Sequence, residues 1–263
     1  MIVEWNHHLF SSDTETYPFH PQATYRPDPD RRSANPLADY RRRMDAEGID
    51  RAVLVQPEPY GDDHSLVLDC VREDPERFRA TSLFYPREPD APGKLERLVA
   101  DHGDLVVATR FHSKPAYMDG FGDDGVRALW ETASDLGLIV ELHLEPGDAS
   151  GAADLVAAFP DTPVVVDHLA EPHTGDPVEY GDVLALADYD NVYAKLSGLN
   201  HFSDDAPRYE SVRPFTRWVV DAFGPDRMIW GSGTPAIVDA HLPECSAAER
   251  EAVKGDNVHE LVW

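Results

Sequence analysis

Short apolar runs alternate with longer amphipathic segments along the whole chain. The runs are rich in Val, Ile and Leu, and several are apolar at consecutive positions, as in parallel strands that are covered on both faces. The predicted strands are residues 1–5, 52–56, 80–84, 105–111, 138–144, 163–167, 192–197 and 227–231. The predicted helices are residues 35–47, 63–73, 94–102, 123–136, 149–159, 177–187, 209–223 and 246–253.

This alternation predicts an α/β fold, and within that class a (β/α)8 TIM barrel. Eight strand and helix pairs in 263 residues suit a barrel, whereas a doubly wound open sheet usually has fewer strands. No internal repeat or Gly/Ser-rich linker divides the chain, so residues 1–263 are predicted to form a single domain. The longest irregular stretch, residues 11–33, follows the first strand and is expected to cover the barrel mouth.

The charge of the chain excludes two classes of partner. Lys and Arg number 23 against 49 Asp and Glu, and a net charge of −26 repels nucleic acid and anionic membranes. A surface rich in short carboxylates and poor in Lys is typical of adaptation to concentrated salt. We therefore expect the protein to work in the cytoplasm of a halophilic organism. Two cysteines are too few for a disulfide framework, and no apolar run reaches about 20 residues. Residues 1–10 lack the basic segment and apolar run of a signal peptide, so we expect an intracellular protein.

Polar side chains cluster where the predicted strands end, which is where barrel enzymes carry their chemistry. Four of these ends carry a histidine, so the sequence predicts a site for a small-molecule substrate. The residues at these ends are Asn6, His8, Gln56, Glu58, Arg110, His112, Glu141, His143, Asp167, His168, Lys195, Ser197 and Gly233.

The order of the motifs resembles the amidohydrolase-related (amidohydrolase 2) family of metal-dependent hydrolase barrels. The likeness is strongest to its 2-pyrone-4,6-dicarboxylate lactonase-like group and extends over almost the whole chain. The motifs that carry it lie at residues 4–10, 52–57, 109–112, 166–169, 195–198, 227–235 and 257–261.

The resemblance implies a hydrolase that acts on a small lactone or another cyclic ester or amide, by a metal-independent or single-metal mechanism. In that group histidines polarise the ester carbonyl, an Asp activates water and Arg holds a substrate carboxylate. Carried over to this chain, the implied catalytic residues are His8, His143 and His168. The implied substrate-binding residues are Asn6, Gln56, Arg110, His112, Glu141 and Ser197.

Two departures from the family pattern fall on the chemistry itself. Asn6 stands where the family has the first His of its His-x-His motif, and Gly233 stands in place of the last-strand Asp. Neither is a zinc ligand, so a binuclear site is excluded, and a single Zn ion would be left with His8, His143 and His168. Without the Asp, the candidates for the general base are Glu141, His143 and His112. Gly233→Asp is expected to be tolerated and to raise hydrolysis.

The residues leave several alternatives open. The barrel could have lost catalysis and bind a small carboxylated ligand, or it could be a non-oxidative decarboxylase, which the missing ligands disfavour. Arg110 could pair with Glu141 or Asp167 instead of substrate. His7 is expected to pack behind the barrel. Surface or loop positions are expected for His64, His201, His241 and His259. Assembly into a homo-oligomer is also left open.

The charge makes a prediction about stability. Salt screens repulsion among carboxylates, so the free energy of unfolding is expected to rise when KCl is raised from millimolar to molar concentration. Urea unfolding at the two salt concentrations measures the difference. Equal stability at both would contradict the halophilic interpretation.

Overall fold

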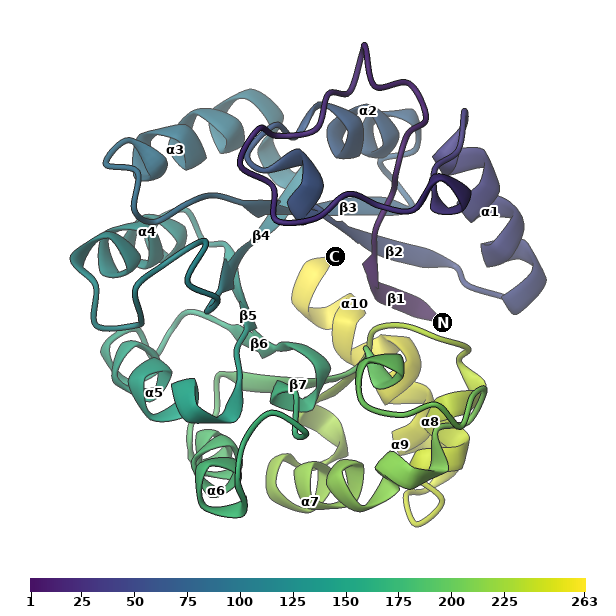
Figure 1. Cartoon of the computed structure of the whole chain (residues 1–263). Helices are drawn as coiled ribbons and strands as arrows, with labels where there is room; N and C mark the ends of the chain where they lie inside the picture. The colour runs from purple at the N-terminus through teal and green to yellow at the C-terminus, as the bar shows by residue number, and fades with distance from the viewer.

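The computed structural model describes residues 1–263 and shows the predicted (β/α)8 barrel (Figure 1). The eight parallel strands follow chain order around the sheet. They are β1 (Val3–His7), β2 (Arg51–Val55), β3 (Phe78–Leu83), β4 (Val106–His112), β5 (Ile139–His143), β6 (Val164–Val166), β7 (Val192–Leu196) and β8 (Met228–Trp230).

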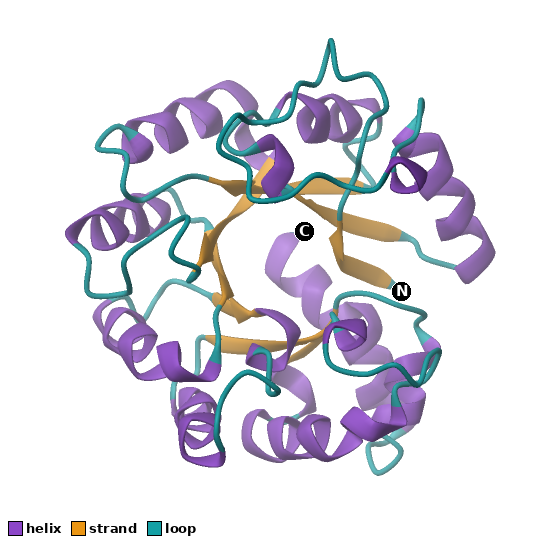
Figure 2. Cartoon of the chain, in the orientation of Figure 1, coloured by secondary structure: helices purple, strands orange, loops and turns teal.

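Helices form an outer ring around these strands, and the last helix lies behind the open centre of the barrel (Figure 1 and Figure 2). They are α1 (Pro36–Glu47), α2 (Ser65–Glu73), α3 (Ala91–His102), α4 (Asp124–Asp135), α5 (Ala149–Ala158), α6 (Pro177–Ala185), α7 (Arg213–Phe223), α8 (Ala236–His241), α9 (Ala247–Glu251) and α10 (Asn257–Val262). Each of the eight predicted strands and eight predicted helices is present with its ends shifted by a few residues, and α8 and α10 are additional to that list. None of the helices is both long and apolar enough to cross a bilayer.

Two apolar layers hold the barrel together. The larger lies between the strands and the surrounding helices, and the smaller fills the lower half of the barrel interior. Val258 of α10 joins Val3, Val53 and Val165 in this inner cluster, so α10 closes the N-terminal end of the barrel. The opposite end, where the strands finish, is left for polar side chains.

The seam between the first and last strands is bridged by a side chain. No ladder joins β8 to β1, whereas every other neighbouring pair is hydrogen-bonded. Arg43 of α1 donates to both carboxylate oxygens of Glu4 on β1 at 2.9 Å and to the carbonyl of Gly233, beyond β8, at 2.7 Å. One guanidinium therefore ties the two edges to the same helix.

A β-bulge near the end of β1 directs the side chains of His7 and His8 to different sides of the strand. The register with β2 shifts between Trp5 and His7, so one extra residue is inserted there. His7 stacks on Tyr40 of α1, with ring centroids 3.6 Å apart, which confirms that it packs behind the barrel. His8 lies on the side of β2 and reaches the carbonyl of Val55.

Two histidines expected at the surface are buried instead. His64 is 5% exposed and its Nε2 accepts from the backbone N–H of Leu83, so it anchors the start of α2 against β3. His241 is 2% exposed and lies between Thr216 and the carbonyl of Arg208. Sequence spacing did not reveal either position because both side chains are buried by long-range contacts.

The seam predicts an asymmetry between neighbouring arginines of α1. Glu4 is almost fully buried, so Arg43→Ala would leave its carboxylate without its counterion and is expected to destabilise the fold by about 3 kcal/mol. Arg42→Ala removes an exposed pair with Asp39 and is expected to change stability by less than about 0.5 kcal/mol. Urea unfolding of the two variants tests the difference, and equal losses would refute the bridging role of Arg43.

Candidate functional site

The site is built from side chains that stand two positions apart on neighbouring strands. Side chains at i and i+2 share a face of a strand. Arg110 and His112 on β4 therefore lie beside Glu141 and His143 on β5, since the two strands pair with Arg110 opposite Glu141. The lower member of each pair is buried in the barrel, and the histidine lies at the mouth.

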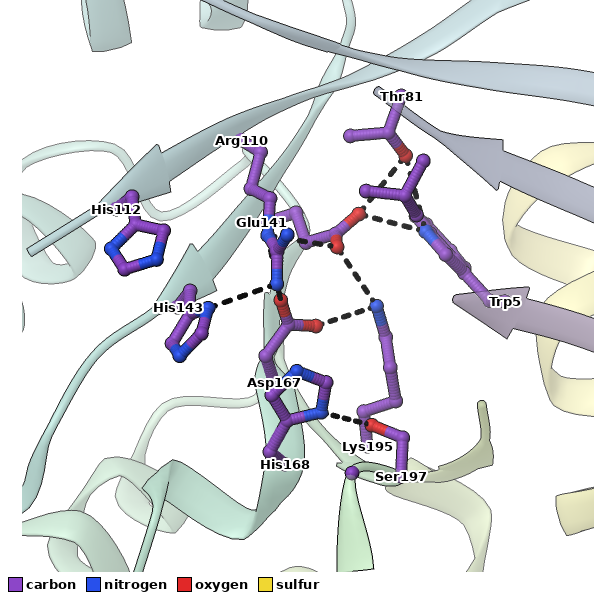
Figure 3. Close-up of polar contacts among 12 residues, drawn as sticks. Trp5, Thr81, Arg110, His112, Glu141, His143, Asp167, His168, Lys195 and Ser197 are labelled. Atoms are coloured by element: carbon purple, nitrogen blue, oxygen red, sulfur yellow. Dashed lines mark hydrogen bonds and ion pairs between the residues drawn. The ribbon is translucent and has the colours of Figure 1, made fainter. Parts of the chain in front are cut away.

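Four buried charged groups form the floor of this site (Figure 3). Lys195 Nζ lies 3.1 Å from Glu141 Oε1 and 2.6 Å from Asp167 Oδ1. Arg110 Nε donates to Asp167 Oδ2 at 2.9 Å. Burial alone would raise the pKa of Asp167, but the charges of Arg110 and Lys195 hold it well below its usual value. We call these four residues the charge layer.

The charge layer changes the roles expected for two residues. The other oxygen of Glu141 accepts from the indole of Trp5 at 2.8 Å and from the hydroxyl of Thr81 at 2.9 Å. Glu141 is completely buried, and its first oxygen faces Lys195 and Arg110, which removes it as a base for water at the mouth. Arg110 pairs with Asp167, the alternative that the sequence left open, so it is not free to clamp a substrate carboxylate bidentately.

Three histidine rings lie above the charge layer. The centroids of His112 and His143 are 4.1 Å apart, and those of His143 and His168 are 5.1 Å apart. Arg110 Nη2 lies 3.0 Å from His143 Nδ1, and because a guanidinium can only donate, the imidazole proton of His143 sits on Nε2. His168 Nδ1 lies 2.7 Å from the hydroxyl of Ser197. Burial is the main reason that the pKa values of all three imidazoles are lowered, so the rings are neutral.

His168 opens a turn of unusual handedness. Four consecutive residues, none of them glycine, have positive φ: 53° at His168, 53° at Leu169, 57° at Ala170 and 48° at Glu171. This conformation costs roughly 1–2 kcal/mol per residue, and such strain clusters at functional sites. The turn also needs a glycine beside it: a Cβ at Gly198 would lie 2.6 Å from the imidazole of His168.

Glu171 is a site residue that the sequence prediction missed. Its Oε1 lies 3.3 Å from His143 Nε2 and 2.9 Å from His201 Nδ1. Burial would raise the pKa of this carboxyl, but the hydrogen bonds from His143 and His201 lower it strongly, so it is ionised. The one sequence signal that could have pointed to Glu171 is its position three residues after His168, in the Asp-His motif that follows β6. His201, expected at the surface, belongs to the site as well.

His8 differs from its expected role as a donor to a substrate carbonyl. Its Nδ1 lies 2.9 Å from the carbonyl of Val55, which can only accept, so the proton sits on Nδ1 and Nε2 carries the lone pair. Burial, followed by the charge of Arg110, lowers its pKa to about 3. A cavity of about 330 Å³ opens beside His8, lined in part by Phe10, Arg31 and Arg43, and it is large enough for a small molecule.

The remaining predicted site residues play local parts. Gln56 is buried and donates to the carbonyls of Gly61 and Asp63 at 2.9 and 2.8 Å, so it shapes the loop after β2. Asn6 Oδ1 is buried without a partner. Gly233 has φ of 83°, and a Cβ there would lie 2.5 Å from Ile237 Cδ1. The expectation that Gly233→Asp is tolerated is therefore wrong, because its backbone conformation favours glycine.

The donor atoms at the mouth do not fit a catalytic zinc ion. Those of His143, His168 and Glu171 all lie within 4.8 Å of one another. However, Arg110 occupies Nδ1 of His143, which leaves the proton on Nε2 and no lone pair for a metal. When Ser197 donates to Nδ1 of His168, the proton of that ring also lies on Nε2. Nε2 of His8 and the carboxylate of Glu171 then remain, and two groups are fewer than the three protein ligands of catalytic zinc sites. The chemistry below is therefore derived from the protein groups alone.

The parallel barrel and the histidines at its mouth place this chain in the class of hydrolase barrels. Residues 3–261 match the family model described as Amidohydrolase, so the chain belongs to the amidohydrolase family. It is 28% identical over 236 residues to 4-sulfomuconolactone hydrolase of Rhizobium radiobacter, covering 88% of this chain and 75% of that protein. It is 28% identical over 200 residues to L-fucono-1,5-lactonase of Burkholderia ambifaria, covering 72% and 66% of the two chains.

Solved structures share the fold at lower sequence identity. A probable 2-pyrone-4,6-dicarboxylic acid hydrolase from Acinetobacter baumannii, with citric acid bound, superposes with a TM-score of 0.80 at 19% identity and covers 99% of this chain and 98% of its own. An amidohydrolase from Burkholderia multivorans with bound zinc also gives 0.80, at 17% identity, covering 100% and 99%. The family resemblance inferred from the motifs is confirmed.

The buried histidines predict acid lability. The pKa values of His8 and His64 fall from 6.5 to about 3 and about 4, mainly through burial. Below pH 6.5 the unfolded chain therefore binds protons that the folded chain does not, so the free energy of unfolding falls as the pH is lowered from 6.5 toward 4. Urea unfolding across this range measures the slope, and His64→Gln is expected to make it shallower. A flat profile would contradict the burial of neutral histidines.

Proposed function

We propose that the protein is a lactone hydrolase that works through its own side chains. The observation that carries the proposal is the neutral His168, held at the barrel mouth with its Nδ1 against the hydroxyl of Ser197. When Ser197 donates to Nδ1, the imidazole proton is kept on Nε2, where it can hydrogen-bond a substrate carbonyl. A neutral donor aimed at the carbonyl oxygen stabilises the oxyanion that forms when water attacks.

The surroundings of His168 support this role. Its Nδ1 and backbone are fixed by Ser197 and by the left-handed turn, so the donor is preorganised. The charge layer beneath contains two acids and two bases, and it holds the mouth rigid without a net charge. The lactone-hydrolysing relatives agree with this reaction. Their substrates, a sulfomuconolactone and a fuconolactone, support a small lactone as the substrate class for this chain.

The setting that we propose is the cytoplasm of an organism that accumulates salt. The excess of carboxylates over basic groups supports it, together with cysteines that need no oxidising compartment.

A lactone panel tests the function. Purified protein, treated with chelator and assayed in molar KCl, is expected to hydrolyse at least one of a set of sugar, carboxylated and sulfonated lactones. His168→Ala is expected to lower kcat/KM by about 10² to 10³ because the oxyanion loses its donor. His102→Ala is the control, since that side chain contacts Arg72 on the outer surface. Absence of turnover, with a carboxylated lactone still raising the Tm, would favour the binding alternative.

A further inference from the structure

The proposed hydrolase lacks an evident base for water. Gly233 has no side chain, and Glu141 is sealed beneath the mouth by Lys195, Trp5 and Thr81. Such a base typically contributes about 10² to 10⁴ in rate, so its identity decides whether the site can turn over.

The geometry points to His201 as this base, with Glu171 as its positioning residue; the inference rests on the proposed lactone hydrolysis. Glu171 Oε1 lies 2.9 Å from His201 Nδ1, and a carboxylate can only accept, so Nδ1 carries the proton. Nε2 then holds the lone pair, and no protein group hydrogen-bonds it. A carboxylate on one ring nitrogen and a free second nitrogen are the arrangement by which an imidazole accepts a proton from a nucleophile.

The surroundings of His201 also place it correctly. Its ring meets that of His168 edge-on, with centroids 4.8 Å apart, so water at His201 lies next to a carbonyl held by His168. The His201 side chain is 41% exposed and lines an open cavity of about 540 Å³ with Asp204 and Asp205. Solvent water therefore reaches Nε2 directly.

The other imidazoles of the mouth are poorer bases. Both nitrogens of His143 are engaged, by Arg110 and by Glu171. His8 exposes a lone pair, but burial and the positive charge of Arg110 oppose its protonation. His112 is packed between Tyr117 and His143. His143 shares the carboxylate of Glu171 but has no free nitrogen, whereas His201 combines that carboxylate on Nδ1 with a lone pair on Nε2 that no protein group occupies.

The resulting reaction balances without another reactant. Water oxygen bonds to the lactone carbonyl carbon while one water proton moves to His201 Nε2, and His168 stabilises the oxyanion. Collapse of the tetrahedral intermediate breaks the ring C–O bond. The leaving oxygen takes the proton from His201, which returns to its neutral form, and the product is a hydroxy acid.

Matched histidines on the two oxygens of Glu171 provide the test. His201→Ala is expected to lower kcat for the lactone that the natural protein hydrolyses by about 10² or more, and added imidazole is expected to restore part of the loss. His173→Ala is the control: its side chain is 42% exposed and faces Glu171 Oε2 at 3.7 Å, so it shares the carboxylate without adjoining His168. Its rate is expected to stay near that of the natural chain.

Glu171→Gln tests the positioning role separately. The amide keeps a hydrogen-bond acceptor for His201 but removes the charge that stabilises the imidazolium, so kcat is expected to fall with little change in KM. Circular dichroism and the Tm of each variant report whether the fold is retained.

The outcomes separate the two hypotheses. If the natural protein hydrolyses no lactone of the panel, the proposed function falls and the base assignment falls with it. If the natural protein is active and His201→Ala keeps its rate, only the base assignment is overturned. Loss of activity that imidazole does not restore would give His201 a structural role and would also overturn it.

Discussion

The charge layer is the constraint on which the rest of the mouth depends. Two carboxylates and two cations are buried inside the barrel, and each is stable there only because the other three are present. Arg110 cannot turn toward a ligand without leaving Oδ2 of the buried Asp167 without its partner and Lys195 as the remaining counterion. Besides pairing with Asp167, the guanidinium of Arg110 can therefore act only through Nη2, which donates to Nδ1 of His143. A neutral network of this kind holds the strand ends in one geometry.

Above the charge layer lies a set of imidazoles, and the neighbours of each ring determine which of its nitrogens carries the proton. A guanidinium leaves the proton of His143 on Nε2, a backbone carbonyl keeps that of His8 on Nδ1, and a carboxylate does the same for His201. Chemically identical side chains thus become donors or acceptors according to what lies behind them. The different roles of the imidazoles come from these partners, which belong to β4, to β2 and to the turn that follows β6.

The sequence predicted the barrel because its signal is local and repeated: each strand and helix is visible in a short window. Period-two spacing likewise placed Glu141 below His143 on one face of β5. It could not show that Trp5, Thr81 and Lys195 converge on Glu141 from three other strands and remove it from catalysis. Glu171 was missed for a similar reason, because a left-handed turn made of ordinary residues leaves no mark in the composition.

The left-handed turn also fixes the distance between His168 and Glu171. In a helix with about three residues per turn, side chains at i and i+3 come out one above the other, and the N–H of Glu171 bonds to the carbonyl of His168 at 3.0 Å. The spacing between this imidazole and the carboxylate is thus set by chain count. Point substitutions at the two intervening positions leave that count intact, whereas one inserted or deleted residue would rotate Glu171 away from the mouth. Length, more than identity, is what natural variation must preserve in this segment.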